Sequence, residues 1–286
     1  MGAAMKFGVN TMIWSGAFDS SIPLDKIKQA GLDGIEIPAF DAKDVDVAVL
    51  KRALSDSDLE CTFCSVNPPG KNPISEDAAV RAETLEHWKQ VVATAGEAGV
   101  QLIAGPTYSP VGHLPGRRRN DDEWKWGVDF HRQLDTALQD AGAELAIEPL
   151  NRFETYFLNT AEDTVRFVDE IGSPRIGILF DTFHSNIEEK SIPEGYQMCG
   201  SRLKHVHACE NDRGVPGTGH VDWTSVLGTL REIGYDGWLT IESFNGTIPQ
   251  LAAATAIWRD LAESMDDIAF EGAAFLKRAW ENENQA

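Results

Sequence analysis

The chain has 286 residues, 42% of them hydrophobic, and 45 acidic against 25 basic residues give it a formal net charge of −20. This excess of negative charge repels phosphate backbones and anionic membrane surfaces, so we expect no nucleic-acid or membrane partner. Four cysteines without a framework of spacings indicate a reducing compartment, and no apolar run reaches the roughly 18 residues of a membrane span. The composition predicts a cytoplasmic globular protein.

The first half of the chain alternates predicted strands and helices. Strands are expected at residues 7–14, 34–38, 60–65 and 101–105. Helices are expected at residues 22–30, 45–54, 77–98 and 122–140. Glycine follows several of these helices, which is typical of helix ends. Apolar residues in the helix 77–98 recur at spacings of three and four, which predicts one buried face.

The second half repeats the alternation. Strand-like runs are predicted at 145–149, 176–181, 203–207 and 238–242, and helices at 161–171, 193–199, 223–233 and 249–281, the last broken near 264–267. About eight β-then-α units follow one another without a linker, which indicates a parallel sheet. We expect a single (β/α)₈ TIM barrel over residues 1–286 with a C-terminal helical extension. An open doubly wound sheet is the alternative.

Each of the last four strands ends on a polar residue: Glu148, Asp181, His207 or Glu242. Their separations are 33, 26 and 35 residues, close to the roughly 31 residues per unit of a barrel of this kind. The carboxyl ends of barrel strands converge on one mouth, whereas in an open sheet they lie along a line. The spacing therefore favours the barrel and predicts that these side chains meet.

Three carboxylates and an imidazole at one mouth would repel each other without a cation. Oxygen-rich ligation with one nitrogen suits Mn²⁺, Mg²⁺ or Co²⁺ better than structural zinc. Taken singly, an acid at a strand end is more often a helix cap, and a histidine there is often a core residue. The recurrence on four successive strands favours a metal site.

Three more polar residues lie just beyond these strands: Glu154, His184 and Arg213. Barrel enzymes place substrate contacts in such loops, so we expect these side chains to bind substrate. The alternatives are a loop salt bridge for Glu154 and Arg213 and a supporting hydrogen bond for His184.

Several motifs resemble those of the ketose 3-epimerases, which include the D-tagatose, D-psicose (allulose) and L-ribulose 3-epimerases of the xylose-isomerase-like barrels. They lie at 147–155, 158–160, 180–189, 207–214, 217–219 and 241–244, with weaker support at 7–14 and 105–112. The resemblance implies that Glu148, Asp181, His207 and Glu242 bind Mn²⁺ or a similar ion. It implies that Glu148 and Glu242 also act as acid and base, that Glu154, His184 and Arg213 hold sugar hydroxyls, and that the protein is a homodimer or homotetramer.

The implied activity is inversion at C3 of a free ketose through a cis-enediolate held on the metal. An ion that holds the C2 carbonyl and the C3 hydroxyl acidifies the C3 proton, so one glutamate can remove it and the other can return a proton to the opposite face. The segment 112–123 departs from the allulose-preferring members, which leaves the preferred ketose open.

Three other functions fit parts of the pattern. A hydroxypyruvate or inosose isomerase would need the same metal and base. A DNA-repair endonuclease on this barrel would need more histidines for several zinc ions and a basic face, which the seven histidines and the net charge of −20 disfavour. A non-catalytic sugar-binding protein would have no use for four buried ligands.

Overall fold

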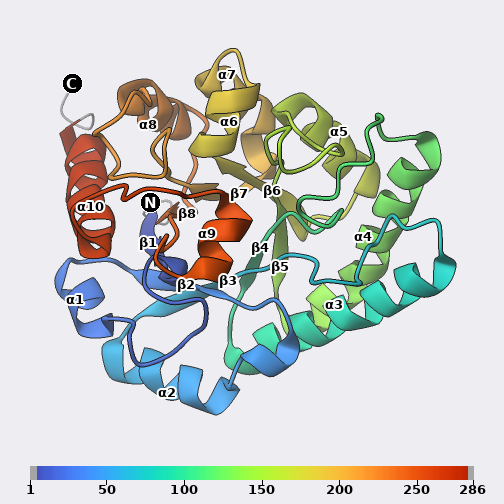
Figure 1. The fold of residues 1–286 in the computed structure, drawn as a ribbon, viewed down its shortest axis with the longest axis horizontal. Coiled ribbons are helices and arrows are strands. Elements are labelled where there is room, and N and C mark those ends of the chain that lie inside the picture. The colour runs from blue at the N-terminus through green and yellow to red at the C-terminus, as the bar shows by residue number, and fades with distance from the viewer. Residues whose placement is uncertain (1–4, 283–286) are drawn as a thin grey trace.

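The computed structural model describes residues 5–282 and contains a closed barrel of eight parallel strands in sequential order. β1 pairs with β8 as well as with β2, which closes the ring (Figure 1). The strands are β1 (Lys6–Asn10), β2 (Gly34–Pro38), β3 (Glu60–Cys64), β4 (Leu102–Gly105), β5 (Glu144–Ile147), β6 (Ile176–Asp181), β7 (Leu203–His207) and β8 (Trp238–Ile241). The prediction of a (β/α)₈ barrel is confirmed, and the open sheet is excluded.

Helices surround the strands as an outer layer (Figure 1). They are α1 (Leu24–Gln29), α2 (Val47–Ser57), α3 (Ala78–Ala98), α4 (Asp121–Ala141), α5 (Ala161–Ile171), α6 (Thr182–Glu188), α7 (Ile192–Cys199), α8 (Trp223–Glu232), α9 (Pro249–Thr255) and α10 (Met265–Asn282). Short 3₁₀ turns lie at η1 (Thr11–Ile13), η2 (Ala42–Asp44) and η3 (Gly200–Arg202).

The long helices begin and end where the local sequence supplies a cap. The Asp77 side chain accepts from the Ala79 N–H at the start of α3, and Asn120 and Glu123 form a reciprocal capping box at the start of α4. Gly99 and Gly142 adopt left-handed backbone conformations after these helices, which ends them without a Cβ clash. The predicted apolar face of α3 packs inward, with Trp88 fully buried.

Most boundaries agree with the sequence prediction to within three residues, and three features depart from it further. The first strand stops at Asn10 because its side chain accepts from the Met12 N–H and turns the chain into η1. The helix α6 was not predicted; it starts directly after Asp181, whose carboxylate caps it at Phe183 N–H. The break in the C-terminal helical region spans residues 256–264 and is wider than predicted, after Ala256 adopts a left-handed conformation at the end of α9.

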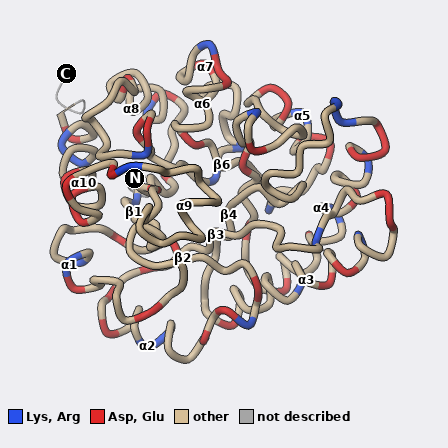
Figure 2. The backbone as a smooth tube through the Cα atoms, in the orientation of Figure 1, with Lys and Arg blue, Asp and Glu red and all other residues tan. Residues whose placement is uncertain are grey.

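The short helix α9 lies inside the ring of outer helices, in front of the strands in Figure 1. Acidic residues are spread over the outer helices and loops (Figure 2). Three consecutive arginines, at 117–119, are partly neutralised: Arg117 pairs with Glu123 and Arg119 with Asp163, each at 2.7 Å. The described residues 5–282 include no helix long and apolar enough to cross a membrane.

Candidate active site and metal centre

The four strand-end side chains meet at the carboxyl end of the barrel. Glu148 follows β5, Asp181 ends β6, His207 ends β7, and Glu242 follows β8. One ligand atom from each lies within 4.8 Å of the others, and all four residues are buried. Asp181 Oδ1 also caps α6 by accepting from the Phe183 N–H. Asp181 is therefore both a helix cap and a member of the cluster. The prediction that the four side chains converge is confirmed.

Two buried atoms in this cluster lack hydrogen-bond partners among the described residues: Glu148 Oε1 and His207 Nδ1. They lie 3.6 Å apart, and His207 Nδ1 lies 3.2 Å from Glu242 Oε2. Buried polar atoms are normally paired, so orphaned atoms that face each other need a partner between them. Three carboxylates and one imidazole nitrogen fit a hard divalent cation. The cluster is therefore a candidate metal-binding site.

Gly105 helps to position Glu148 at the carboxyl end of the barrel. The Gly105 carbonyl accepts a hydrogen bond from the Glu148 N–H at 3.1 Å. Gly105 has a φ of +138°, and a Cβ there would lie 2.1 Å from the Ser65 carbonyl oxygen. Only glycine fits this conformation and this approach of two backbones.

The protein environment holds protons within the cluster. Burial raises the pKa of Glu148 to about 8, with further upward contributions from Glu242 and Asp181, while His207 opposes the shift. Burial likewise raises the pKa of Asp181, against the effect of Arg213. Burial lowers the pKa of His207, but the Glu242 and Glu36 carboxylates outweigh it and raise that pKa well above its ordinary value. A cation would have to displace the proton that Glu148 holds below about pH 8.

Metal affinity should therefore rise with pH. The pKa of Glu148 is about 8, so below about pH 8 this side chain is protonated in the folded, metal-free protein. An ion binds only its carboxylate form. We expect the affinity for Mn²⁺ to increase by about tenfold or more per pH unit up to about pH 8, since at least one proton leaves per ion. Calorimetry in buffers of different ionisation enthalpy measures this release. An affinity that stays constant from pH 6 to 8 would contradict it.

Arg213 lies directly against the cluster. Its Nη1 donates to Asp181 Oδ2 at 2.8 Å and to Glu242 Oε2 at 2.6 Å. Its guanidinium carbon lies 4.2 Å from the Phe183 ring centroid, and its backbone has a φ of +67°. The Ser243 hydroxyl donates to the Arg213 carbonyl and fixes this conformation. The guanidinium thus neutralises two of the carboxylates.

His184 and Glu154 are linked through Asn151. The Asn151 N–H donates to His184 Nδ1 at 3.1 Å, and its side-chain amide donates to Glu154 Oε1 at 2.8 Å. Burial and the neighbouring Arg213 lower the pKa of His184 well below its ordinary value, so the ring is neutral. His184 Nε2 lies 3.2 Å from Arg213 Nη2 and 3.7 Å from Glu148 Oε1, so the ring stands between the guanidinium and the carboxylate cluster.

A cavity of about 190 Å³ adjoins the cluster. Glu148, Glu154, His184, Arg213 and Glu242 line one side of it, and the remaining walls are mostly apolar side chains, among them Met12, Phe40, Val66, Val111, Phe244, Leu251 and Ala254. It is smaller than the roughly 300–1,000 Å³ of drug-sized sites, which suits a single small molecule. Residues of α9 also line it, whereas none of residues 112–123 do.

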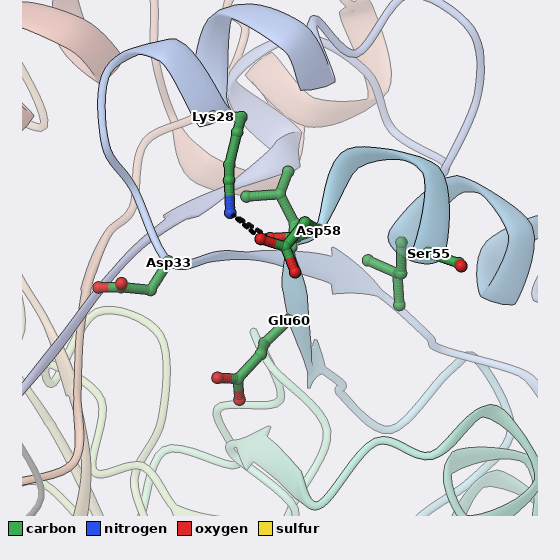
Figure 3. Close-up of a pocket in the computed structure, with 7 residues that line it drawn as sticks. Lys28, Asp33, Ser55, Asp58 and Glu60 are labelled. Carbon is green, nitrogen blue, oxygen red and sulfur yellow. Dashed lines mark hydrogen bonds and ion pairs between the residues drawn. The ribbon is translucent and has the colours of Figure 1, made fainter.

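A larger hollow, about 490 Å³, lies at the opposite end of the barrel (Figure 3). Lys28, Asp33, Asp58 and Glu60 line it. Lys28 pairs with Asp58 at 2.8 Å, as the dashed line in Figure 3 shows, and Lys6 pairs with Glu60 at 2.6 Å. The amino-terminal end of such barrels contributes to stability rather than to catalysis, so this hollow is not the candidate site.

All seven predicted site residues lie in one region of the structure. Three residues that support them were not predicted: Asn151, Glu36 and His205. Glu36 and His205 are both fully buried and joined at 2.8 Å. A signal existed: Glu36 is a charged residue flanked by two isoleucines inside a predicted strand, where a charge costs free energy unless it is paired.

A family model described as "Xylose isomerase-like TIM barrel" matches residues 24–277. This match and the closed barrel define the class of protein. A "Probable ketose 3-epimerase" of Synechocystis sp. is 32% identical and covers 97% of both chains. An "L-ribulose 3-epimerase" of Methylomonas sp. is 30% identical over 96% of this chain and 98% of the relative. A crystal structure of a D-allulose 3-epimerase from Methylomonas sp. in complex with D-allulose aligns with a TM-score of 0.92 at 29% identity, over 97% of this chain and 98% of that one.

The chain belongs to the ketose 3-epimerase family of xylose isomerase-like TIM barrels. It is an isomerase of the epimerase class. The resemblance found in the sequence motifs is confirmed.

Proposed function

We propose that the protein is a metal-dependent epimerase that inverts C3 of a free ketose, of the D-tagatose, D-psicose/D-fructose or L-ribulose type. The observation that carries the proposal is the buried cluster of Glu148, Asp181, His207 and Glu242 beside a cavity of about 190 Å³. A divalent ion held there, most simply Mn²⁺ with Co²⁺ or Mg²⁺ as alternatives, would polarise the ketose carbonyl and acidify the C3 proton.

In this proposal the two glutamates transfer the protons. Glu148 and Glu242 come from β5 and β8 and approach His207 Nδ1 to 3.6 and 3.2 Å. One removes the C3 proton from one face of the sugar, and the other donates a proton to the opposite face, which inverts C3. Glu154, His184 and Arg213 bind the sugar hydroxyls. Glu148, Glu242, His184 and Arg213 are buried, which excludes bulk water from the proton transfers.

The cavity favours an unphosphorylated sugar. Arg213 is the only lysine or arginine among the described residues that line it, and its guanidinium is already engaged by Asp181 and Glu242. A phosphate group would need further donors to offset its charge. We propose one barrel domain over residues 1–286, assembled as a homodimer or homotetramer in the cytoplasm; light scattering measures the assembly.

The second candidate is a hydroxypyruvate or inosose isomerase, which would use the same cluster. The three polar groups beyond the strands, Glu154, His184 and Arg213, favour a polyhydroxylated chain over a short hydroxy acid. A DNA-repair endonuclease is disfavoured, because a formal net charge of −20 repels a phosphate backbone and a cavity of about 190 Å³ suits a single small molecule.

Isotope exchange tests the proposal. Incubation with D-fructose, D-tagatose and L-ribulose in D₂O with Mn²⁺ should place deuterium at C3 of the ketoses that react, and the C3 epimer should appear. Deuterium at C1 or C2, with an aldose product, would instead indicate an isomerase that moves the carbonyl. Metal-loaded protein that exchanges no proton with any ketose would overturn the proposal. NMR spectroscopy of the sugar locates the label.

A further inference from the structure

A buried carboxylate, Glu36, lies beneath the candidate metal site. It belongs to β2, on which it is fully buried. Four donors surround it: Asn10 Nδ2 at 2.9 Å, Thr62 Oγ1 at 3.1 Å, His205 Nε2 at 2.8 Å and His207 Nε2 at 2.7 Å. An ionised carboxylate is costly to bury, and these charge-assisted hydrogen bonds offset the cost.

The contact with Glu36 determines which nitrogen of His207 faces the cluster. A carboxylate only accepts hydrogen bonds, so His207 Nε2 carries a proton and donates it to Glu36 Oε1. His207 Nδ1 points the other way, toward Glu148 and Glu242, and has no hydrogen-bond partner among the described residues. Nδ1 is thereby the nitrogen available to a cation.

His205 keeps the carboxylate from rotating. It lies two residues before His207 on β7, so both rings project from the same face of the strand. The two rings contact each other edge-on, with centroids 5.0 Å apart. Each donates to a different oxygen of Glu36, and together they fix both oxygens.

We propose that Glu36 is a positioning residue for the metal site: it holds His207 with Nε2 protonated and Nδ1 directed at the ion, and its negative charge favours a cation above it. The inference rests on the proposed metal site. Carboxylates that accept from a ligating histidine typically change metal affinity by about 10- to 100-fold when they are replaced. A network that only stabilised the barrel would leave metal affinity unchanged.

The test compares two substitutions on the same carboxylate. Glu36→Gln keeps the shape but removes the charge, and its NH₂ group cannot accept from an imidazole N–H. Thr62→Val removes another hydrogen bond to Glu36 without touching either ring. We expect the Kd for Mn²⁺, measured by calorimetry, to rise by about 10- to 100-fold in Glu36→Gln and by less than about threefold in Thr62→Val.

A second measurement needs no variant. In the Mg²⁺-loaded wild-type protein, ¹⁵N–¹H correlation spectra should show His207 protonated at Nε2 and without a proton at Nδ1. The opposite tautomer would overturn the inference, as would an unchanged Kd in Glu36→Gln or an equal loss in Thr62→Val. Those results would leave the proposed function standing, whereas a wild-type protein that binds no Mn²⁺ would overturn the metal site and this inference together.

Discussion

Replacement of Glu242 by glutamine should lower kcat for C3 epimerisation by about 10³-fold or more, because general acid–base catalysis contributes roughly 10²–10⁴ and the amide cannot carry the proton. The barrel should remain folded, since the side chain keeps its volume. Coupled product analysis measures kcat, and metal analysis of the same samples shows whether the ion is still bound. Full activity in a metal-loaded variant would contradict the proton-transfer role.

The variant Glu148→Gln, together with Glu242→Gln, tests whether the two glutamates act on opposite faces of the sugar. If the two glutamates act on opposite faces, each single variant retains one functional base. Glu242→Gln should then exchange the C3 proton of one epimer with D₂O without inverting it, and Glu148→Gln should do the same for the other epimer. Exchange of the same epimer by both variants would refute the two-face arrangement.

A control for both variants lies at the other end of the barrel. Glu144 begins β5 and pairs with Lys204 at 2.7 Å, far along the strand from the mouth. Glu144→Gln removes a carboxylate from the strand that positions Glu148 but changes no charge at the mouth, so it should leave kcat within about twofold, since it breaks only a partly exposed ion pair. A large loss there would indicate that the glutamine variants act through the barrel and not through proton transfer.

The cluster could be predicted from sequence because the same pattern, an apolar strand that ends on a ligand-type residue, occurs four times. Glu148, Asp181, His207 and Glu242 each end an apolar run, and the spacing of the runs matches the barrel unit. Parallel strands of a barrel bring their carboxyl ends together whatever the details of packing. The pattern concerns strand ends only, however, so it could not find Glu36, which lies in the middle of β2.

The contacts that orient the cluster could not be predicted in the same way. Glu36 meets His207 across the barrel interior, between residues 171 positions apart in the chain, and no local pattern encodes such a pair. Arg213 reaches Asp181 and Glu242 only because its backbone adopts a left-handed conformation, which arginine rarely does. Asn151 acquires its role only when the loop after β5 meets His184 of α6 in the folded chain. Sequence spacing predicts the positions of the strand ends, and tertiary contacts determine the orientation of the side chains there.

Removal of the divalent ion should abolish turnover yet leave the barrel folded, because Arg213 replaces part of the lost positive charge. Its guanidinium contacts Asp181 at 2.8 Å and Glu242 at 2.6 Å, and the raised pKa of Glu148, about 8, lets that side chain hold a proton at neutral pH. Chelation should therefore shift the melting temperature only slightly, and added Mn²⁺ should restore turnover. Unfolding on chelation would contradict this account of the metal-free cluster.

Arg213→Met tests whether the arginine replaces part of the charge of the missing ion, since it keeps much of the side-chain volume and removes the charge. Without an ion, Asp181 and Glu242 would lose their buried partner, so we expect the free energy of unfolding to fall by about 3–5 kcal/mol. Saturating Mn²⁺ should recover most of this loss, because the ion neutralises the same carboxylates. Arg259→Met breaks an exposed pair with Asp212 at 2.7 Å and should cost at most about 1 kcal/mol with or without Mn²⁺. Equal stability of Arg213→Met with and without Mn²⁺ would show that the arginine and the ion do not share these partners.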